Sequence, residues 1–163
     1  MSDLRKMVEG LGHSHVRTLL NSGNVVFQAK RPRVADLARS IQTGISGSFG
    51  ISARVIVFAA SDLKTIIDEN PLRAVASDPA RYMVAFVDGP ATLAKAKPLL
   101  SEAWEPEALS VGTKTAYLWC ANGVADSKLA KALGRVTGDA ATTRNWATVL
   151  KLYATTTSNP NAD

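Results

Sequence analysis

The chain has 163 residues, of which 46% are hydrophobic and 20% charged, so it is long enough to bury a core and is globular rather than disordered. Its net charge of +5 permits association with polyanions but makes only a weak case for nucleic-acid binding. No apolar run approaches the roughly 20 residues that a membrane helix needs, the first ten residues do not read as a signal peptide, and the single cysteine, Cys120, excludes an internal disulfide. We therefore expect a cytoplasmic protein that does not bind membranes.

The first half predicts helices and strands in the order α-β-β-α-β-α. Apolar residues recur at helical spacing in residues 2–12, which end on Gly12, and "NSG" joins two β-rich runs as a hairpin turn would. Ser61 is the expected cap of the last helix of this half, which stops before Pro71. The predicted elements are helix 2–12, strands 15–20 and 24–29, helix 34–50, strand 52–59 and helix 61–70. The basic run "KRPR", residues 30–33, reads as a solvated turn.

The second half predicts the same order preceded by one more strand, β-α-β-β-α-β-α. We expect a kink at Pro98 in the first of its helices and an N-cap at Asp126 in the second. A β-α-β-β-α-β unit is the ferredoxin-like split βαβ motif, in which the first and third strands are neighbours. The predicted elements are strand 81–89, helix 91–104, strands 108–112 and 115–123, helix 126–136, an extended segment 139–143 and helix 145–153.

Together the two halves predict an α+β protein of two ferredoxin-like βαββαβ(α) repeats. The first repeat, residues 1–78, lacks the N-terminal strand that the second, residues 79–163, possesses. Each repeat is expected to form a subdomain.

Two stretches resemble a bacterial family known as domain of unknown function 1697 (DUF1697). They are "LRKMVEGLGHSHVRTLLNSGNVVF", residues 4–27, and "TTRNWATVLKL", residues 142–152, and the likeness extends over roughly residues 2–152. Members of the family usually open with a strand and a glycine-containing loop, which this chain lacks, and usually have Asn where it has Ala147. The resemblance implies the duplicated fold and carries no function with it.

The absent strand has a physical consequence for the first sheet. It would be a central strand, flanked by the strand at about residues 16–20 and by residues 52–58. Its absence would expose backbone donors and acceptors, an arrangement prone to association. Either the natural start lies upstream, or another segment or subunit fills the gap, in which case the chain could form a homo-oligomer there.

Most catalytic chemistry finds little support in the sequence. His13 and His15 could place two imidazoles on one side of an extended segment, but no further ligand stands at a recognised spacing, so we predict no metal site. Cys120 has no neighbouring cation or helix N-terminus to activate it. No nucleophile elbow, Walker or dinucleotide-binding motif is present, and no cofactor is predicted.

Aromatic residues alternate along two strands that the topology makes neighbours. Tyr82 and Phe86 share one face of their strand, and Tyr117 and Trp119 share one face of theirs. The small apolar residues that alternate with them suit the opposite face, beneath the two helices of this half. This face could be open and stack bases, as in RNA-recognition domains of the same topology, although their glycine-aromatic motif is absent. Alternatively, the closing helix or the first half covers these rings as core.

Arg144 stands at the start of the closing helix, where the helix dipole disfavours a cation by about 0.3–1 kcal/mol. Lys128 takes a similar position in the preceding helix. A cation beside a helix N-terminus can bind a phosphate or carboxylate. The alternatives are that Arg144 pairs with a carboxylate of the other half, that Lys128 points into water, and that Asn145 and Trp146 act as cap and core anchor.

The leading hypothesis is therefore a protein that binds an anionic ligand, a nucleotide or single-stranded nucleic acid, between its two subdomains. The proposed contacts are cationic or polar at Arg144, Lys128, Arg17 and Asn145, and stacking at Tyr117 and Trp119. The rival hypotheses are an enzyme whose site needs the absent glycine-containing loop, and a structural or oligomerisation module.

Overall fold

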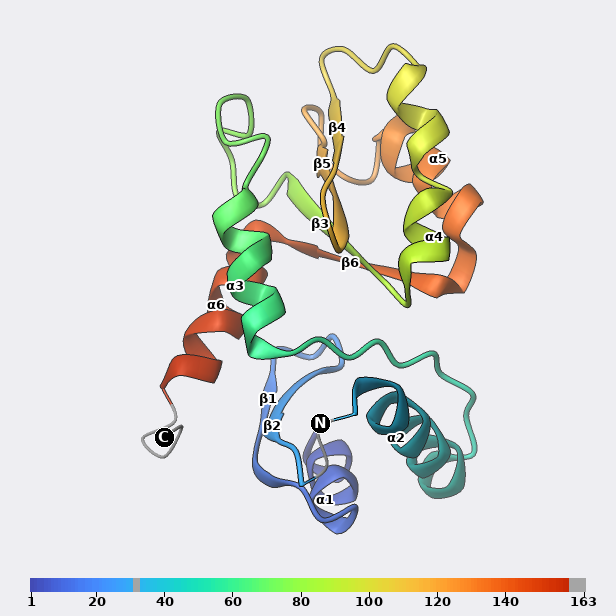
Figure 1. Cartoon of the computed structure of the whole chain (residues 1–163), viewed down its shortest axis with the longest axis vertical. Coiled ribbons are helices and arrows are strands. Elements are labelled where there is room, and N and C mark those ends of the chain that lie inside the picture. The colour runs from blue at the N-terminus through green and yellow to red at the C-terminus, as the bar shows by residue number, and fades with distance from the viewer. Residues whose placement is uncertain (31–32, 159–163) are drawn as a thin grey trace. The chain divides into compact units, whose positions relative to one another are not determined.

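The computed structural model describes residues 1–30 and 33–158, whose path Figure 1 shows. In this part of the chain the protein is mixed α+β, with two antiparallel sheets and six α-helices. It divides into two compact units. Unit 1 runs from Met1 to Ala60 and includes the end of the closing helix from Leu152, and unit 2 runs from Ser61 to Lys151. The division after residue 78 follows the predicted internal repeat and stays a prediction. In the structure, residues 61–78 lie in unit 2.

Unit 1 opens with the predicted helix, hairpin and helix. Its elements are α1 (Ser2–Gly10), β1 (Ser14–Leu19), β2 (Asn24–Gln28) and α2 (Val34–Phe49). The side-chain amide of Asn24 fixes the hairpin turn, because it donates to the carbonyl of Leu19 at 3.2 Å and to Oγ of Ser22 at 2.8 Å. Gly23 has a φ of +76°, which favours glycine. Of the predicted basic turn at residues 30–33, Arg31 and Pro32 lie outside the described residues.

The prediction of a strand at residues 52–59 is wrong. Residues 51–59 belong to neither sheet, although their β-branched composition is typical of a strand. A strand needs a neighbour that supplies ladder hydrogen bonds, and among the described residues the sheet of unit 1 contains only β1 and β2. The backbone N–H of Val55 donates to Oε1 of Gln42 on α2, at 3.4 Å.

Unit 2 holds a four-stranded antiparallel sheet with the order β4-β5-β3-β6. The predicted adjacency of the first and third strands of this half is confirmed, because β3 pairs with β5 from Tyr82 opposite Trp119 to Phe86 opposite Thr115. The elements are α3 (Ala60–Glu69), β3 (Tyr82–Val87), α4 (Pro90–Ala94), the 3₁₀ helix η1 (Lys97–Ser101), β4 (Ala108–Val111), β5 (Thr115–Trp119), α5 (Lys128–Thr137), the 3₁₀ helix η2 (Gly138–Ala140), β6 (Ala141–Asn145) and α6 (Trp146–Thr157).

Three predicted helix details differ in unit 2. The expected helix 91–104 is two pieces, α4 and η1, because Pro98 has no N–H and its ring clashes with the carbonyl four residues earlier. The N-cap of α5 is Ser127 rather than Asp126, since Oγ of Ser127 accepts a hydrogen bond from the third helical residue. Ser61 lies inside α3, which begins one residue earlier.

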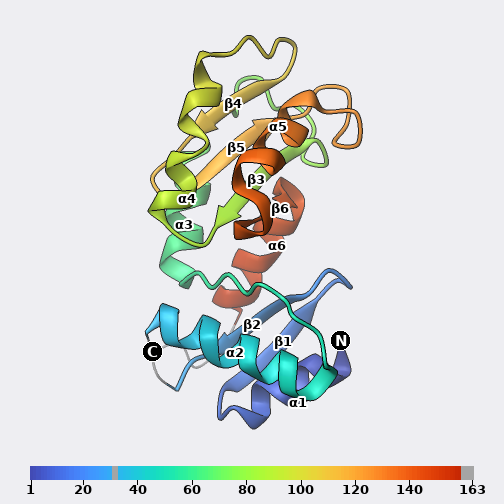
Figure 2. The same cartoon turned by 90° about the vertical axis from the view of Figure 1, so that its right-hand side faces the viewer.

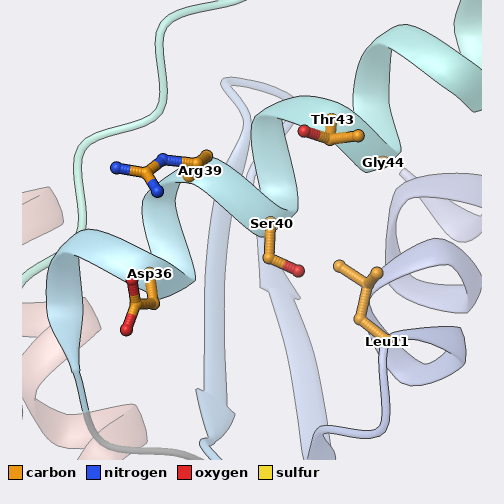
Figure 3. A pocket seen from close by; sticks show the side chains of 6 residues that line it. All are labelled: Leu11, Asp36, Arg39, Ser40, Thr43 and Gly44. Carbon is orange, nitrogen blue, oxygen red and sulfur yellow. The ribbon is translucent and has the colours of Figure 1, made fainter.

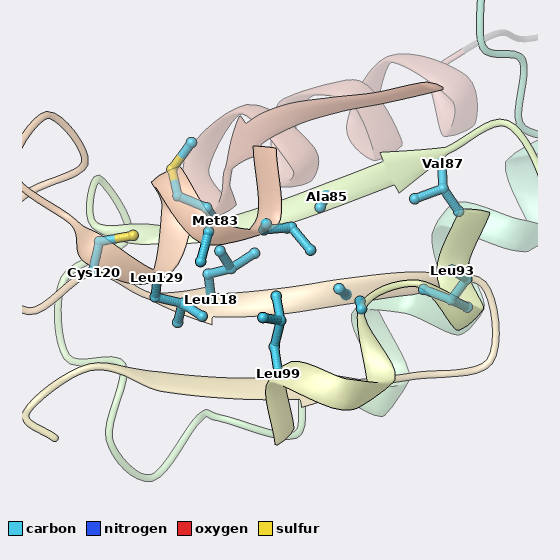
Figure 4. Close-up of a cluster of buried hydrophobic side chains, with 12 residues drawn as sticks. Met83, Ala85, Val87, Leu93, Leu99, Leu118, Cys120 and Leu129 are labelled. Carbon is cyan, nitrogen blue, oxygen red and sulfur yellow. The ribbon is translucent and has the colours of Figure 1, made fainter. Parts of the chain in front are cut away.

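The two faces of the sheet of unit 2 bury different side chains. The aliphatic face packs under α4, η1 and α5, as the alternation of small apolar residues predicted. Figure 4 shows this core, and α4 and α5 lie side by side over it in Figure 2. Its buried members are Met83, Ala85, Val87, Leu93, Ala96, Leu99, Ala116, Leu118, Cys120, Leu129, Ala132 and Leu133.

None of the helices among residues 1–30 and 33–158 is long and apolar enough to cross a membrane.

Candidate functional site

The aromatic face of the sheet of unit 2 is buried. Tyr117 is fully buried, Tyr82 is 2% exposed and Trp119 is 9% exposed. Trp146, the first residue of α6, stacks on Tyr82 with ring centroids 4.8 Å apart and planes inclined by 20°. The alternative that these rings are core, covered in part by the closing helix, is therefore confirmed. A base could stack on Tyr117 or Trp119 only after this packing opened.

The hydroxyl of Tyr117 joins the sheet to the last turn of α3. It lies 2.8 Å from Oε2 of Glu69 and 3.0 Å from the carbonyl oxygen of Ile66, to either of which it can donate. Oε1 of Glu69 accepts from the backbone N–H of Thr113 at 3.2 Å and from its hydroxyl at 2.6 Å. We call these four residues the α3 anchor.

The electrostatics of the α3 anchor suit a structural link rather than an acid–base pair. Partial burial raises the pKa of the Glu69 carboxyl, but the hydrogen bonds from Thr113 and Tyr117 outweigh it and hold the pKa below its usual value. Burial raises the pKa of Tyr117 above its ordinary range, and the neighbouring carboxylate raises it further. At neutral pH the pair is thus a fixed carboxylate and a neutral phenol, with no proton to exchange.

Arg144 lies on β6 rather than in the first turn of α6. Its Nη1 donates to Oγ1 of Thr142 at 2.7 Å and to the carbonyl oxygen of Thr143 at 2.8 Å. Oδ1 of Asn145 accepts from the backbone N–H of Thr148 at 2.9 Å, which is the predicted capping role. Burial lowers the pKa of Arg144 from its usual value, although a guanidinium stays charged at neutral pH. These contacts along its own strand favour a structural role for Arg144.

The N-terminus of α5 is occupied by groups of the chain itself. Oγ of Ser127 accepts from the backbone N–H of Ala130 at 2.8 Å, and Oε2 of Glu107 accepts from that of Leu129 at 3.1 Å. A carboxylate at a helix N-terminus is favoured by the helix dipole, and here Glu107 takes the place that an external anion would need. Lys128 is exposed and does not complete a helix-terminus anion site.

Lys128 instead belongs to a group of exposed cations. It shares one side of α5 with Lys131 and Arg135, at the spacing i, i+3, i+7, and α5 contains no acidic residue. Lys95 and Lys97 are exposed at α4 and η1, which cover the same sheet face. Within the described part of the chain, none of these five side chains forms an ion pair or a side-chain hydrogen bond. We call them the basic helical surface.

Sequence reasoning selected Lys128 alone from this surface. The other two cations of α5 could have been identified from their spacing, because Lys131 and Arg135 stand three and seven residues after Lys128 and such positions lie on one helix face. Lys95 and Lys97 belong to this surface because α4 and η1 pack on the same sheet face as α5.

The cysteine and histidine residues show no catalytic arrangement. Cys120 is fully buried, and burial raises the pKa of its thiol. The His13 ring packs on Phe27 with centroids 4.7 Å apart, and its Nδ1 accepts from the backbone N–H of Lys30 at 3.4 Å. His15 is exposed, with a φ of 52°. Among the described residues, no three His, Cys, Asp or Glu side chains are grouped to hold a metal ion.

A shallow depression of about 380 Å³ lies on unit 1, between the end of α1 and the side of α2 (Figure 3). Arg17, the predicted ligand contact of this unit, does not line it, but lies exposed on β1 opposite Val26 of β2. The depression has one cation, one carboxylate and two hydroxyls, which point to no particular ligand class. Its lining residues are Leu11, Asp36, Arg39, Ser40, Thr43 and Gly44.

Comparison with known proteins gives a family and a fold. The conserved bacterial protein SP0830 from Streptococcus pneumoniae has a solved structure that superposes with a TM-score of 0.78, at 21% identity, over 95% of this chain and 87% of that chain. At that identity the likeness establishes the fold alone. No curated protein sequence matches the chain. The family profile described as "Protein of unknown function (DUF1697)" matches residues 1–117, and the chain therefore belongs to the DUF1697 family.

Proposed function

We propose that this is a cytoplasmic protein of two ferredoxin-like repeats that binds the phosphate backbone of single-stranded nucleic acid on its basic helical surface. The observation that carries the proposal is the set of five exposed cations on α4, η1 and α5, none with an ionic partner in the described residues. The strand order of unit 2, with the first and third strands adjacent, supports the ferredoxin-like repeat.

The arrangement of these cations favours a polyanion over a single nucleotide. Lys128 and Arg135 stand seven residues apart on α5, which is about 10.5 Å along a helix axis. Such a row can contact successive phosphates, and each contact releases counterions from the strand. A single nucleotide would meet only one or two exposed cations, and the rings of Tyr117 and Trp119, which lie on the opposite face of the sheet, are buried and offer its base no stacking platform. The expected binding is therefore independent of base sequence.

Salt dependence tests the proposal directly. Fluorescence anisotropy with a labelled oligothymidine should give a plot of log K against log salt with a slope of about −3.5 if all five cations contact phosphates of a single strand. Replacing Lys128, Lys131 and Arg135 together by Gln should reduce the slope to about −1.4, because two of the five contacts then remain.

A matched variant distinguishes binding at the basic helical surface from a general effect of net charge. Replacing Lys6, Arg33 and Arg39 of unit 1 by Gln removes the same number of positive charges, three, from exposed positions outside this surface. This control should keep the full slope. Equal weakening by the two triple variants would show that binding follows net charge alone, and the proposed surface would then be wrong.

A further inference from the structure

Trp104 is the partly exposed aromatic residue of unit 2, all of whose residues the structure describes. The other aromatic side chains of this unit, on β3, β5 and α6, are buried. The ring of Trp104 packs against the aliphatic core beneath α4, η1 and α5, so it lies on the same face of the sheet as the basic helical surface. Its indole Nε1–H donates to the carbonyl oxygen of Leu99 at 2.7 Å, which fixes the ring in place.

The contacts of the segment that carries Trp104 place this residue between two elements of the basic helical surface. Leu99, its hydrogen-bond partner, belongs to η1, which carries one of the five cations. On the other side, the backbone N–H of Glu107 donates to the carbonyl oxygen of Trp104 at 2.8 Å. Oε2 of Glu107 in turn accepts from the backbone N–H of Leu129, the neighbour of Lys128 on α5. The segment of Trp104 thus joins a cation-bearing element at each of its ends.

We infer that Trp104 is the base-stacking position of the basic helical surface, so that the ligand there is a strand with bases rather than any polyanion. The inference rests on the proposed function and deepens it. Proteins that bind single strands without sequence preference combine a cationic path for the backbone with aromatic rings on which bases stack. The cations supply the phosphate contacts, and the ring supplies the contact that polyphosphate or another base-free polyanion cannot make.

The charges beside the ring agree with this division of roles. Glu102 and Glu105 stand two residues before and one residue after Trp104, and both side chains are exposed. Carboxylates repel phosphates, so the backbone of a bound strand follows the lysines and the arginine instead. A base is uncharged and meets no such repulsion at the indole. Because the hydrogen bond to Leu99 and the core contact already hold the ring, stacking costs little side-chain entropy.

Two labelled strands of equal length separate the contact with a base from the contacts with phosphate. One is an oligothymidine, and the other has a stable abasic site in place of every base, so the phosphates are the same. At one salt concentration, the wild-type protein should bind the oligothymidine roughly 5- to 150-fold more tightly, which is the range for one stacked base. Trp104→Leu keeps an apolar side chain against the core, and it should remove this preference while leaving the Kd for the abasic strand unchanged. Trp104→Phe keeps an aromatic face and should retain part of the preference.

Photocrosslinking tests the same position in the wild-type protein, without a variant that could fold poorly. A strand with iodouracil in place of thymine should form its adduct at Trp104, as read by peptide mass spectrometry. An adduct confined to other residues would overturn the inference.

The strand comparison has its own contrary outcomes. Equal binding of the two strands by the wild type would show that phosphates alone are bound, and it would remove the stacking position while the proposed function stands. A preference that persists in full in Trp104→Leu would assign the base to another ring. If neither strand binds the wild type, the proposed function is wrong, and the inference is wrong with it.

Discussion

The sharpest test of the structural argument is Tyr117→Phe, because it removes one oxygen atom from the α3 anchor and leaves the ring in place. The Tyr117 side chain is fully buried, and its hydroxyl reaches Oε2 of Glu69 and the carbonyl of Ile66. Ile66 is in the last turn of α3, and its carbonyl oxygen also accepts from the backbone N–H of Asn70 at 3.4 Å, so the phenol adds to a long helical hydrogen bond. Phenylalanine keeps the packing, so the change isolates the polar contribution.

The expected loss of stability can be estimated from the groups that the Tyr117 hydroxyl contacts. A hydrogen bond to a charged group contributes about 1.5–3 kcal/mol, and no cavity is added because the ring volume is kept. For a chain of this length, about 2–4 °C per kcal/mol gives a decrease in Tm of roughly 3–12 °C. Glu69 retains both hydrogen bonds from Thr113, which limits the loss to the contact with Tyr117.

Urea unfolding followed by circular dichroism would measure the change, with Tyr153→Phe as the matched control. Tyr153 lies on α6 and is only partly buried, so its hydroxyl should matter little to stability. Equal stability of Tyr117→Phe and the wild type would refute the reasoning, because it would mean that the hydroxyl exchanges these partners for water at no cost.

Three further predictions concern the same unit. Gly112→Ala should destabilise the protein by about 1–3 kcal/mol, because the added Cβ would lie 2.7 Å from Cε2 of Tyr117 and against Oε2 of Glu69. An unfolding midpoint in urea equal to that of the wild type would contradict this overlap. The pKa of Glu69 is lower in the folded state than in the unfolded chain, so its stabilising contribution is present above pH of about 4.3 and is lost as pH falls through the folded pKa. The difference in Tm between wild type and Glu69→Gln should therefore be largest near neutral pH and shrink in acid, and a difference that grows in acid would reverse the assigned sign. Ser127→Ala should cost about 1 kcal/mol as a lost N-cap of α5, measured by urea unfolding, unless the neighbouring carboxylate at that terminus caps the helix unaided.

Some features of the candidate site follow from the local sequence pattern, and others are decided by tertiary packing. The exposure of Lys128 and its neighbours on α5 follows from helical spacing, because Leu129 and Leu133 must face the sheet. The hydrogen bond from Leu129 N–H to Glu107 at the N-terminus of α5 joins segments 22 residues apart, so the sequence could not show it. Arg144 was expected at or just before the first turn of the closing helix and lies on β6, and the sequence did not show that its guanidinium would bond to its own strand.

By itself the sequence determined most of the helices and strands, the adjacency of β3 and β5, and the separation of aliphatic and aromatic sheet faces, because each depends on periodicity, turn residues and simple topology. Tertiary structure alone decided whether residues 52–59 form a strand, since a ladder needs a neighbour that composition cannot supply. It also decided that the aromatic face is core. Alternation places Tyr82 and Tyr117 on one face, but only the packing of α3 and α6 removes that face from water.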